Sequence, residues 1–528
     1  MSFPVGLAEE KPSVFTTETL ANDLEKSGAT QDDKPINHVK VDEKISWWTS
    51  LRQNPKAFGW CCYMLFTCIM WGYDGLASAI VLSIPKFRED YGRLWHGQYV
   101  VSANWQLAFT AASMIGLMLG GICSGLSMKH VGQRWAMAVG YVFTTAGVFL
   151  QWYSPGHLAM LFGGKLLTGI PLGVFLTTAP VYCSEVAPPS LRGAMIAAVN
   201  WSIVIGQLLS YGVMRQTQSR DDSMSYRIMF AVQWGFAGVG AALLPFCPES
   251  PMRLLARHKL EDAKTSIARL YNSDVVDSKV AEIQALLAHE AGLAANAGTW
   301  LDCFKGTNRL RTLIACSVFF LQANSGVSWV VGYMGYFMQL GGMKPKTSFD
   351  LNVGVTGLMA VGCMCGWVFV EKIGRRLTIL IGLIACTVCL LVIGILTQFI
   401  DHGSTIVYTQ VGFMAVWGFM YQASIGGVGY TLISEVPASS VRSQTQGLAT
   451  ATNGLFSSVW SFALPYMINP DEANMGGNVA FLFFGCLVVG DIFVYFAYPE
   501  TKGRSFEEID ELFNRGVRPR DFAKTKLN

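Results

Sequence analysis

The chain has 528 residues, of which 52% are hydrophobic and only 14% are charged, whereas a soluble globular domain has about 25% charged residues. The formal net charge of +3 argues against a nucleic-acid partner. The 13 cysteines lack the paired spacing typical of a metal site. These features predict a polytopic membrane protein that needs neither metal nor cofactor.

Long apolar runs divide the chain after a polar start. Residues 1–56 are rich in Lys, Asp, Glu, Ser and Thr, a composition that predicts a disordered tail. Runs of about 20 apolar residues mark membrane-spanning helices, and they predict six spans in residues 57–247 and six more in residues 311–498. The approximate spans are 58–82, 104–126, 135–153, 157–181, 194–214, 228–246, 311–337, 350–370, 377–399, 407–432, 446–467 and 479–497.

Two polar segments complete the plan of the chain. Residues 248–310 lie between the halves, and within them 259–271 and 277–293 place apolar residues three and four apart with charges between. That pattern predicts amphipathic surface helices. The tail, 499–528, has a serine followed by two acidic residues near 505–508, which is typical of a helix start.

Basic residues predict which loops face the cytoplasm. They gather in the loops after spans 2, 4, 6 and 8: Lys129, His130, Arg134, Arg192, Arg253, Arg257, Lys259, Lys372, Arg375 and Arg376. Both tails and the middle segment are therefore predicted to be cytoplasmic. The longest loop on the other side, 83–103, also carries Lys86, Arg88 and Arg93, so the bias is not perfect.

Three short motifs occur once in each half. Residues 184–193 and 434–443 both begin Ser-Glu-Val, so that Glu185 matches Glu435 and Arg192 matches Arg442. Pro-Glu-Ser at 248–250 returns as Pro-Glu-Thr at 499–501, and Gly-Gln-Arg at 132–134 returns as Gly-Arg-Arg at 374–376. Repeats of this kind indicate two homologous halves, an arrangement typical of secondary transporters.

These motifs carry a resemblance to a known family. Residues 248–255 (Pro-Glu-Ser-Pro-Met-Arg-Leu-Leu), 499–503 (Pro-Glu-Thr-Lys-Gly) and 371–376 (Glu-Lys-Ile-Gly-Arg-Arg) resemble the signatures of the sugar porter family of the major facilitator superfamily. Within it the chain is similar to fungal proton-coupled sugar permeases of the α-glucoside (maltose-type) or hexose group. The resemblance implies an all-α fold of twelve spans in two six-helix halves with a cytoplasmic helical linker. It also implies a plasma-membrane transporter, not an enzyme, that works by alternating access.

The same resemblance implies a cytoplasmic gate of charged residues. Ion pairs at the cytoplasmic span ends can form and break without the full cost of burying a charge. The alternative is that these residues only set the orientation in the membrane. The gate residues are Glu185, Arg192, Glu435, Arg442, Glu371 and Arg375.

One acidic residue lies deep in the first span. Asp74 follows Trp71-Gly72-Tyr73 in an apolar run. A carboxylate inside the membrane is energetically costly, so it indicates a functional residue by default. Lys165 in span 4 supplies a cation where the family has arginine. The resemblance implies that Asp74 and Lys165 couple transport to protons; the alternative is a static buried ion pair.

Amides and one aromatic residue match substrate positions of the family. Gln207, Gln322 and Asn453 lie in spans 5, 7 and 11, and Tyr430 in span 10 stands where the family often has tryptophan. Amides suit sugar hydroxyls because both donate and accept hydrogen bonds, although a lone amide can also join two helices. Span 7 departs from the family because Ala323 replaces its second amide. That change favours a disaccharide or another polyhydroxylated solute.

The predicted function is import of a sugar, a disaccharide or hexose, together with protons. One alternative is a facilitator or exporter of another small polyhydroxylated metabolite. A second alternative is a sugar sensor that does not transport. The expected partners are the sugar, protons and the lipid bilayer.

Overall fold

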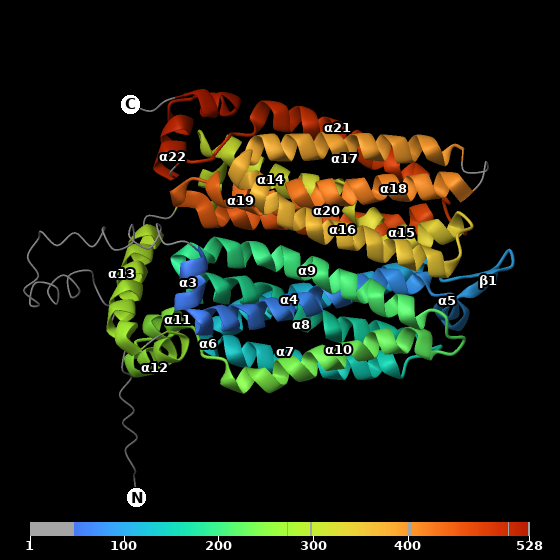
Figure 1. Cartoon of the computed structure of the whole chain (residues 1–528), viewed down its shortest axis with the longest axis horizontal. Helices are drawn as coiled ribbons and strands as arrows, with labels where there is room; N and C mark the ends of the chain where they lie inside the picture. Colours follow the sequence, from blue (N-terminus) through green and yellow to red (C-terminus); the bar gives the residue numbers. More distant parts are fainter. Residues whose placement is uncertain (1–46, 272, 296–297, 400–403, 505, 526–528) are drawn as a thin grey trace, which may run out of the picture.

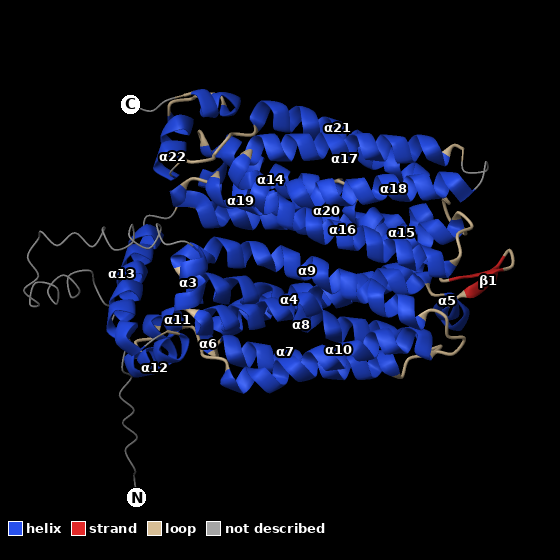
Figure 2. Ribbon diagram, viewed as in Figure 1, coloured by secondary structure: helices blue, strands red, loops and turns tan. Residues whose placement is uncertain are grey.

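Two helical bundles lie side by side with their helix axes nearly parallel (Figure 1). This computed structural model describes residues 47–271, 273–295, 298–399, 404–504 and 506–525. The predicted disordered stretch 1–46 lies outside the described residues. Short extra helices gather at one end of the molecule, here named the linker end, and a small β-hairpin marks the opposite end, here named the hairpin end (Figure 2).

The first bundle contains six long helices. They are α4 (Pro55–Ile80), α6 (Ala103–His130), α7 (Gln133–Trp152), α8 (Leu158–Val186), α9 (Pro189–Thr217) and α10 (Met224–Leu243). Between α4 and α6, at the hairpin end, lie η1 (Val81–Ser83), α5 (Pro85–Tyr91), β1 (Arg93–Trp95) and β2 (Gln98–Val100). The two strands pair antiparallel, with Arg93 opposite Val100.

The second bundle repeats the plan with two broken spans. Its helices are α14 (Asn308–Asn324), α15 (Val327–Leu340), α16 (Pro345–Lys372), α17 (Arg375–Thr397), α18 (Ser404–Tyr421), η6 (Gln422–Gly426), α19 (Gly427–Glu435), α20 (Arg442–Ile468) and α21 (Val479–Ala497). Helices α14 and α15 together form span 7, and α18, η6 and α19 together form span 10. Short 3₁₀ turns, η7 (Ser439–Val441) and η8 (Gly476–Asn478), precede α20 and α21.

The linker end carries the polar helices. After η2 (Leu244–Phe246) the chain forms α11 (Pro251–Ala256), α12 (Leu260–Leu270), η3 (Ser273–Val275), α13 (Val276–Ala295) and η4 (Trp300–Phe304), and after α21 it forms α22 (Phe506–Asn514) and η9 (Pro519–Lys524). Helices α12 and α13 occupy the two segments with amphipathic spacing. One difference concerns the predicted disordered tail, because its last residues are helical: α3 spans Trp47–Gln53 and α4 begins at Pro55.

Length and composition alone mark nine helices in the described part of the chain as candidate membrane spans. Helices α4, α7 and α20 are not among them. Each of the three buries polar side chains inside the bundle, such as Asp74 of α4, Gln151 of α7 and Thr445 of α20. These three helices complete the two sets of six long helices and carry polar side chains that face inward.

The breaks in the second bundle have local causes. Span 7 is interrupted at Gly326, whose φ of 90° is a backbone conformation that glycine adopts without steric cost. Span 10 is interrupted at Ser424, which has φ −124° and ψ −107° inside the π-helical turn η6. The Gln322 amide nitrogen donates to the carbonyl oxygens of Ile425 (2.8 Å) and Gly426 (3.3 Å). The break in span 10 is thus satisfied by a side chain that lies one turn before the break in span 7.

Candidate functional site

A buried carboxylate lies at the centre of the first bundle. Asp74 of α4 is 1% exposed, and its Oδ1 lies 3.3 Å from the Lys165 ammonium of α8. The Gln233 amide nitrogen of α10 donates to the same oxygen at 2.7 Å. Among the described residues no group bonds the other oxygen, Oδ2, which is also buried. One carboxylate oxygen is thus satisfied from two helices, while the second has no hydrogen-bond partner among the described residues.

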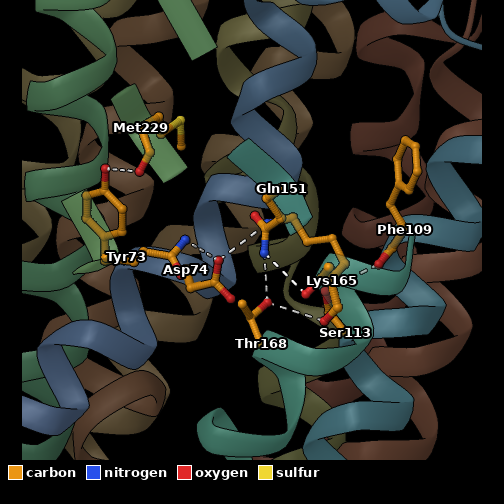
Figure 3. A network of polar contacts seen from close by, with 10 residues as sticks. Tyr73, Asp74, Phe109, Ser113, Gln151, Lys165, Thr168 and Met229 are labelled. Carbon is orange, nitrogen blue, oxygen red and sulfur yellow. Dashed lines mark hydrogen bonds and ion pairs between the residues drawn. The ribbon is translucent and has the colours of Figure 1, made fainter. Parts of the chain in front are cut away.

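Lys165 and Asp74 belong to a network of polar contacts inside the first bundle (Figure 3). Lys165 is 1% exposed and lies 5.0 Å from the ring centroid of Phe230 on α10, a cation–π contact. One turn along α8, Thr168 accepts a hydrogen bond of 3.1 Å from the Gln151 amide of α7. Phe230 of α10 therefore packs against the cation, while the hydrogen bond between Gln151 and Thr168 joins α7 to α8 one turn away.

Helix α4 touches α9 directly beside this cluster. A Cβ atom on Gly72 would lie 2.0 Å from the carbonyl oxygen of Ile203, and one on Gly206 would lie 2.0 Å from that of Ile69. Only residues without a side chain allow this backbone contact. Because Asp74 follows Gly72 by two residues and Gln207 follows Gly206 by one, the crossing joins the carboxylate cluster to the helix that carries Gln207.

One face of α9 points toward the second bundle. The Asn200 amide donates to Gln422 Oε1 at 3.0 Å, and the Tyr211 hydroxyl donates to the Val331 carbonyl at 2.6 Å. Gln207 is seven residues after Asn200 and four before Tyr211, so it lies on the same face of the helix. Its Oε1 is buried and has no hydrogen-bond partner among the described residues. An unused acceptor therefore sits on the surface where the two bundles meet.

The second bundle offers an amide and two further polar side chains. Gln322 is 5% exposed, and its nitrogen is used at the break in span 10 as described above. The Tyr430 ring meets the Phe319 ring edge-on, at 5.4 Å between centroids, and Phe319 lies one turn before Gln322. Asn453 of α20 is half-buried and accepts a hydrogen bond of 3.2 Å from the Ser457 hydroxyl. Gln322 and Tyr430 therefore lie close together on α14 and α19, whereas Asn453 comes from α20.

Polar contacts between the bundles gather at the hairpin end. The Gln106 amide of α6 donates to Asn469 Oδ1 at 2.8 Å, and Arg93 of β1 pairs with Asp471 at 2.7 Å. The apolar core follows the same pattern. One cluster joins the second bundle to the hairpin-end part of the first, and another, at the linker end, is built from the first bundle with α12 and α13. The bundles are thus closed on each other at the hairpin end.

Comparison with known proteins decides the family. A family model described as "Sugar (and other) transporter" matches residues 60–513. The chain belongs to this sugar transporter family. The general alpha-glucoside permease of Saccharomyces cerevisiae (strain ATCC 204508 / S288c) is 30% identical over 538 residues, covering 100% of this chain and 86% of that relative. Maltose permease MAL31 of the same strain is 29% identical over 491 residues, covering 91% of this chain and 79% of the relative.

Solved structures agree on the fold of this sugar transporter. The inward-open conformation of the xylose transporter XylE from E. coli has a TM-score of 0.70 at 21% identity, covering 86% of this chain and 99% of that one. A structure of the same major facilitator protein with 6-bromo-6-deoxy-D-glucose has a TM-score of 0.67 at 22% identity. The predicted fold class is therefore confirmed: an all-α major facilitator fold with two six-helix halves.

Two predicted gate residues of the sugar transporter, Glu435 and Glu185, each contact a side chain of their own half. Glu435 pairs with Arg375 at 2.8 Å and accepts a hydrogen bond from Thr501 at 2.5 Å. Arg375, another of the predicted gate residues, is therefore an ion-pair partner of Glu435. In the first half the Gln133 amide donates to Glu185 at 3.1 Å. Because Gln133 corresponds to Arg375 in the repeat, the first half keeps the contact without the positive charge.

The other gate residues differ in environment. Glu371 is exposed at the end of α16. Arg192 and Glu185 line a small pocket beside α13, together with Lys279 and Glu282. In the first half the predicted gate residues therefore face the linker helices.

Two acidic residues that the sequence analysis did not single out for a role anchor the linker end of the sugar transporter. Glu500 accepts the backbone N–H groups of Arg375 (2.9 Å) and Arg376 (3.2 Å) at the start of α17. Glu249 accepts that of Gln133 (2.8 Å) at the start of α7. A carboxylate at a helix N-terminus satisfies free N–H groups and the helix dipole. The repeated Pro-Glu motif was the signal, and its partners could be identified only in three dimensions.

Sequence analysis also missed Gln233 and Gln422. Gln233 is a lone amide in the sixth span, and only the fold brings it to Asp74. Gln422 is a lone amide at the break of span 10 that meets Asn200. The signal in both cases was an amide in an apolar run, which by itself does not say which helix it faces.

Proposed function

We propose that this protein imports a sugar, an α-glucoside disaccharide in preference to a hexose, together with protons by alternating access. The observation that carries the proposal is the buried cluster of Asp74, Lys165 and Gln233 in a member of the sugar transporter family. An ionisable pair at this depth costs more than an apolar pair of similar size. Reversible protonation gives it a function that offsets the cost.

In the proposed cycle a proton binds Oδ2 of Asp74, the oxygen that lacks a partner among the described residues. The neutral carboxyl then no longer attracts Lys165, which weakens the tie between α4 and α8. Because α4 is in backbone contact with α9 at Gly72 and Gly206, this change reaches the face of α9 that meets the second half. Proton binding and the contact between the halves are linked in this way.

The proposed sugar site lies between that face of α9 and the broken spans 7 and 10. Gln207 contributes an unused acceptor, and Asn453 and Gln322 contribute amides from the second half. Tyr430 offers an aromatic ring to the C–H face of a sugar. The α-glucoside class is supported by the names of the 30%-identical relatives and by Ala323, which leaves room where the family has an amide.

The proposed orientation puts the linker end in the cytoplasm of a cell whose plasma membrane holds the protein. Two of the three basic residues that weaken the charge bias at the hairpin end, Lys86 and Arg93, are neutralised by acids, and the third, Arg88, donates to Gln339 Oε1 at 3.2 Å. Lys86 pairs with Glu89 and Asp90, each at 3.1 Å, and hydrogen bonds to Asp90 and then Glu89 raise the pKa of Lys86. Arg93 is paired with Asp471. Closure at the hairpin end then corresponds to an inward-open state, with the charged residues of the linker end as the proposed cytoplasmic gate.

The test uses the purified protein in proteoliposomes. With an inward proton gradient, labelled maltose is expected to accumulate and the interior to acidify in step with uptake. Glucose and xylose are expected to accumulate less. If labelled maltose only reaches equal concentrations on both sides, with or without the proton gradient, proton coupling is rejected. A preference for a monosaccharide or a non-sugar polyol would reject the proposed substrate class.

A further inference from the structure

A long groove lies on the outer side of the first half, away from the sugar site. It has a volume of about 1120 Å³ and runs along α7, which faces the end of α10 at Ala241 and the turn η2, down to the linker helix α12. Figure 1 shows these helices at the margin of the molecule farthest from the second half. The groove therefore opens toward the surrounding membrane and not toward the space between the halves.

The walls of the groove are apolar and turned outward. Trp135, Val142 and Phe149 line it from α7, with exposed fractions of 65%, 67% and 50%. From Trp135 to Phe149 the helix advances about 21 Å, which exceeds half of the roughly 30 Å hydrocarbon core of a bilayer. An acyl chain of one leaflet fits along this length.

The linker end of the groove is positively charged. Arg134 and Arg269 line it there, and neither makes an ion pair within the described part of the chain. The two acids that also line this end are already compensated: Glu249 by Arg253 at 3.4 Å, and Asp262 by Lys259 at 3.7 Å. Two guanidinium charges are therefore left facing the level at which lipid headgroups lie.

We propose that this groove binds an anionic phospholipid of the leaflet on the linker side, with an acyl chain between α7 and α10 and the phosphate against Arg134 and Arg269. Arginine suits phosphate because its planar fork donates two hydrogen bonds. The apolar walls distinguish a lipid from free phosphate, and the two charges distinguish an anionic lipid from a neutral one. The inference does not depend on the identity of the transported sugar.

The site has a defined neighbour through which it acts. Glu249 and Arg253 line the same groove. Glu249 accepts the backbone N–H group of Gln133 at the start of α7, and Arg253 pairs with Glu249. A lipid seated here packs against that junction and stiffens the contact between α7 and the linker helices. The expected consequence is greater thermal stability in membranes that contain the lipid.

The first test measures binding without transport. The protein in nanodiscs of phosphatidylcholine, with or without phosphatidylserine, is photolabelled with a phosphatidylserine that carries a diazirine on its acyl chain. The label is expected on peptides of α7 and α10, and unlabelled phosphatidylserine is expected to compete. Equal competition by phosphatidylcholine, or by soluble glycerophosphoserine, would overturn the proposal in favour of a neutral-lipid or a headgroup-only site.

Two double variants test whether the two arginines of the groove provide the preference for an anionic lipid. Arg134→Gln with Arg269→Gln is expected to weaken the anionic preference roughly thirtyfold, since each basic residue near an anionic lipid contributes about fivefold. The matched control, Arg257→Gln with Arg309→Gln, removes the same charge from exposed positions that do not line the groove and is expected to change little. If both double variants lose the preference for the anionic lipid equally, the preference comes from the general surface charge and the proposed site is rejected.

Filling the groove keeps the proposal testable if the arginine variant folds poorly. Ala146→Trp adds a ring between the walls while both arginines remain, and it is expected to abolish acyl labelling of α7. Val388→Trp adds the same ring to an outward-facing position of α17 that is 52% exposed and is expected to leave labelling intact. Undiminished labelling in Ala146→Trp would overturn the assignment.

Discussion

At the scale of single residues, the first half concentrates its polar chemistry in one buried cluster. Asp74 is held by Lys165 and Gln233 from two other helices. Gln207 lies on α9, the helix that α4 contacts at Gly72 and Gly206, and its Oε1 has no hydrogen-bond partner among the described residues. The proposed proton site and one proposed sugar contact are therefore carried by two helices in direct backbone contact.

The first prediction concerns the carboxylate. Asp74→Asn keeps the size and removes the titratable group, so proton-driven accumulation of maltose should fall to equal concentrations on the two sides. Exchange of labelled for unlabelled sugar should persist. The matched control is Asp491→Asn, since Asp491 is also a carboxylate within a span but bonds Thr387 in the second half at 2.7 Å. Accumulation that survives in Asp74→Asn, or that disappears equally in both variants, would contradict the role of Asp74.

The second prediction concerns the unused acceptor. Gln207→Ala removes one hydrogen bond to a sugar hydroxyl in a site shielded from water, which costs about 1–3 kcal/mol. The KM for maltose should therefore rise about five- to a hundredfold with little change in thermal stability. Gln410→Ala is the control, because Gln410 is buried and its amide nitrogen donates a hydrogen bond to the Thr397 hydroxyl within the second half at 2.9 Å. It should lower the melting temperature and leave KM unchanged, and the reverse pattern would remove Gln207 from the site.

At the scale of helices, the ends and breaks explain motifs that composition does not. Glu500 caps the start of α17, and Glu249 caps the start of α7, each beside a glycine of positive φ. The break of span 10 depends on Gln322 in the same way, because its amide takes up carbonyl groups that the helix leaves free. Carbonyls without partners inside a membrane are costly, so these side chains keep the irregular helices in place.

The third prediction concerns one of these caps. Gly374 has φ +105°, and a Cβ there would lie 2.5 Å from Glu500 Oε2. Gly374→Ala should strain the backbone and displace the carboxylate, for a loss of about 2–4 kcal/mol from strain and capping together. Thermal melting in detergent measures it. Gly354→Ala, at an exposed helical position with no atom near the added Cβ, should be neutral or stabilising by up to about 1 kcal/mol. Equal melting temperatures for the two variants would refute the cap.

At the scale of the whole molecule, the two halves are joined at one end. Asn469 is fully buried there, and it accepts a hydrogen bond from Gln106 and donates one to the Val101 carbonyl at 3.0 Å. These contacts cross between the halves, whereas the ion pair of Glu435 with Arg375 stays within one. The balance between the two access states therefore depends on the hairpin end as well as on the charged linker end.

The fourth prediction tests that balance. Asn469→Ala removes two hydrogen bonds between the halves and should shift the equilibrium toward opening at the hairpin end by about 1–3 kcal/mol. Spin labels at positions 99 and 472, on opposite halves, should then show a larger population of long distances. Asn478→Ala, which loses a bond to Gln398 inside the second half, should leave the distribution unchanged. An unchanged distribution in Asn469→Ala would show that these bonds do not hold the end closed.

The number and approximate limits of the spans, the two-fold repeat and the family could be predicted from the sequence, because each follows from local composition and short motifs. Apolar runs of span length have few alternatives to crossing a membrane, and the pairing of Asp74 with Lys165 followed from the scarcity of buried charges. Three contacts needed the packed helices: Gln233 completes this pair, Arg375 pairs with Glu435, and Gln322 satisfies a broken helix. An amide or a guanidinium in a helix has several possible partners, and the rotation and crossing of the helices select among them. The charged groove between α7 and α10 has the same origin, since its walls and its arginines come from segments more than a hundred residues apart in sequence.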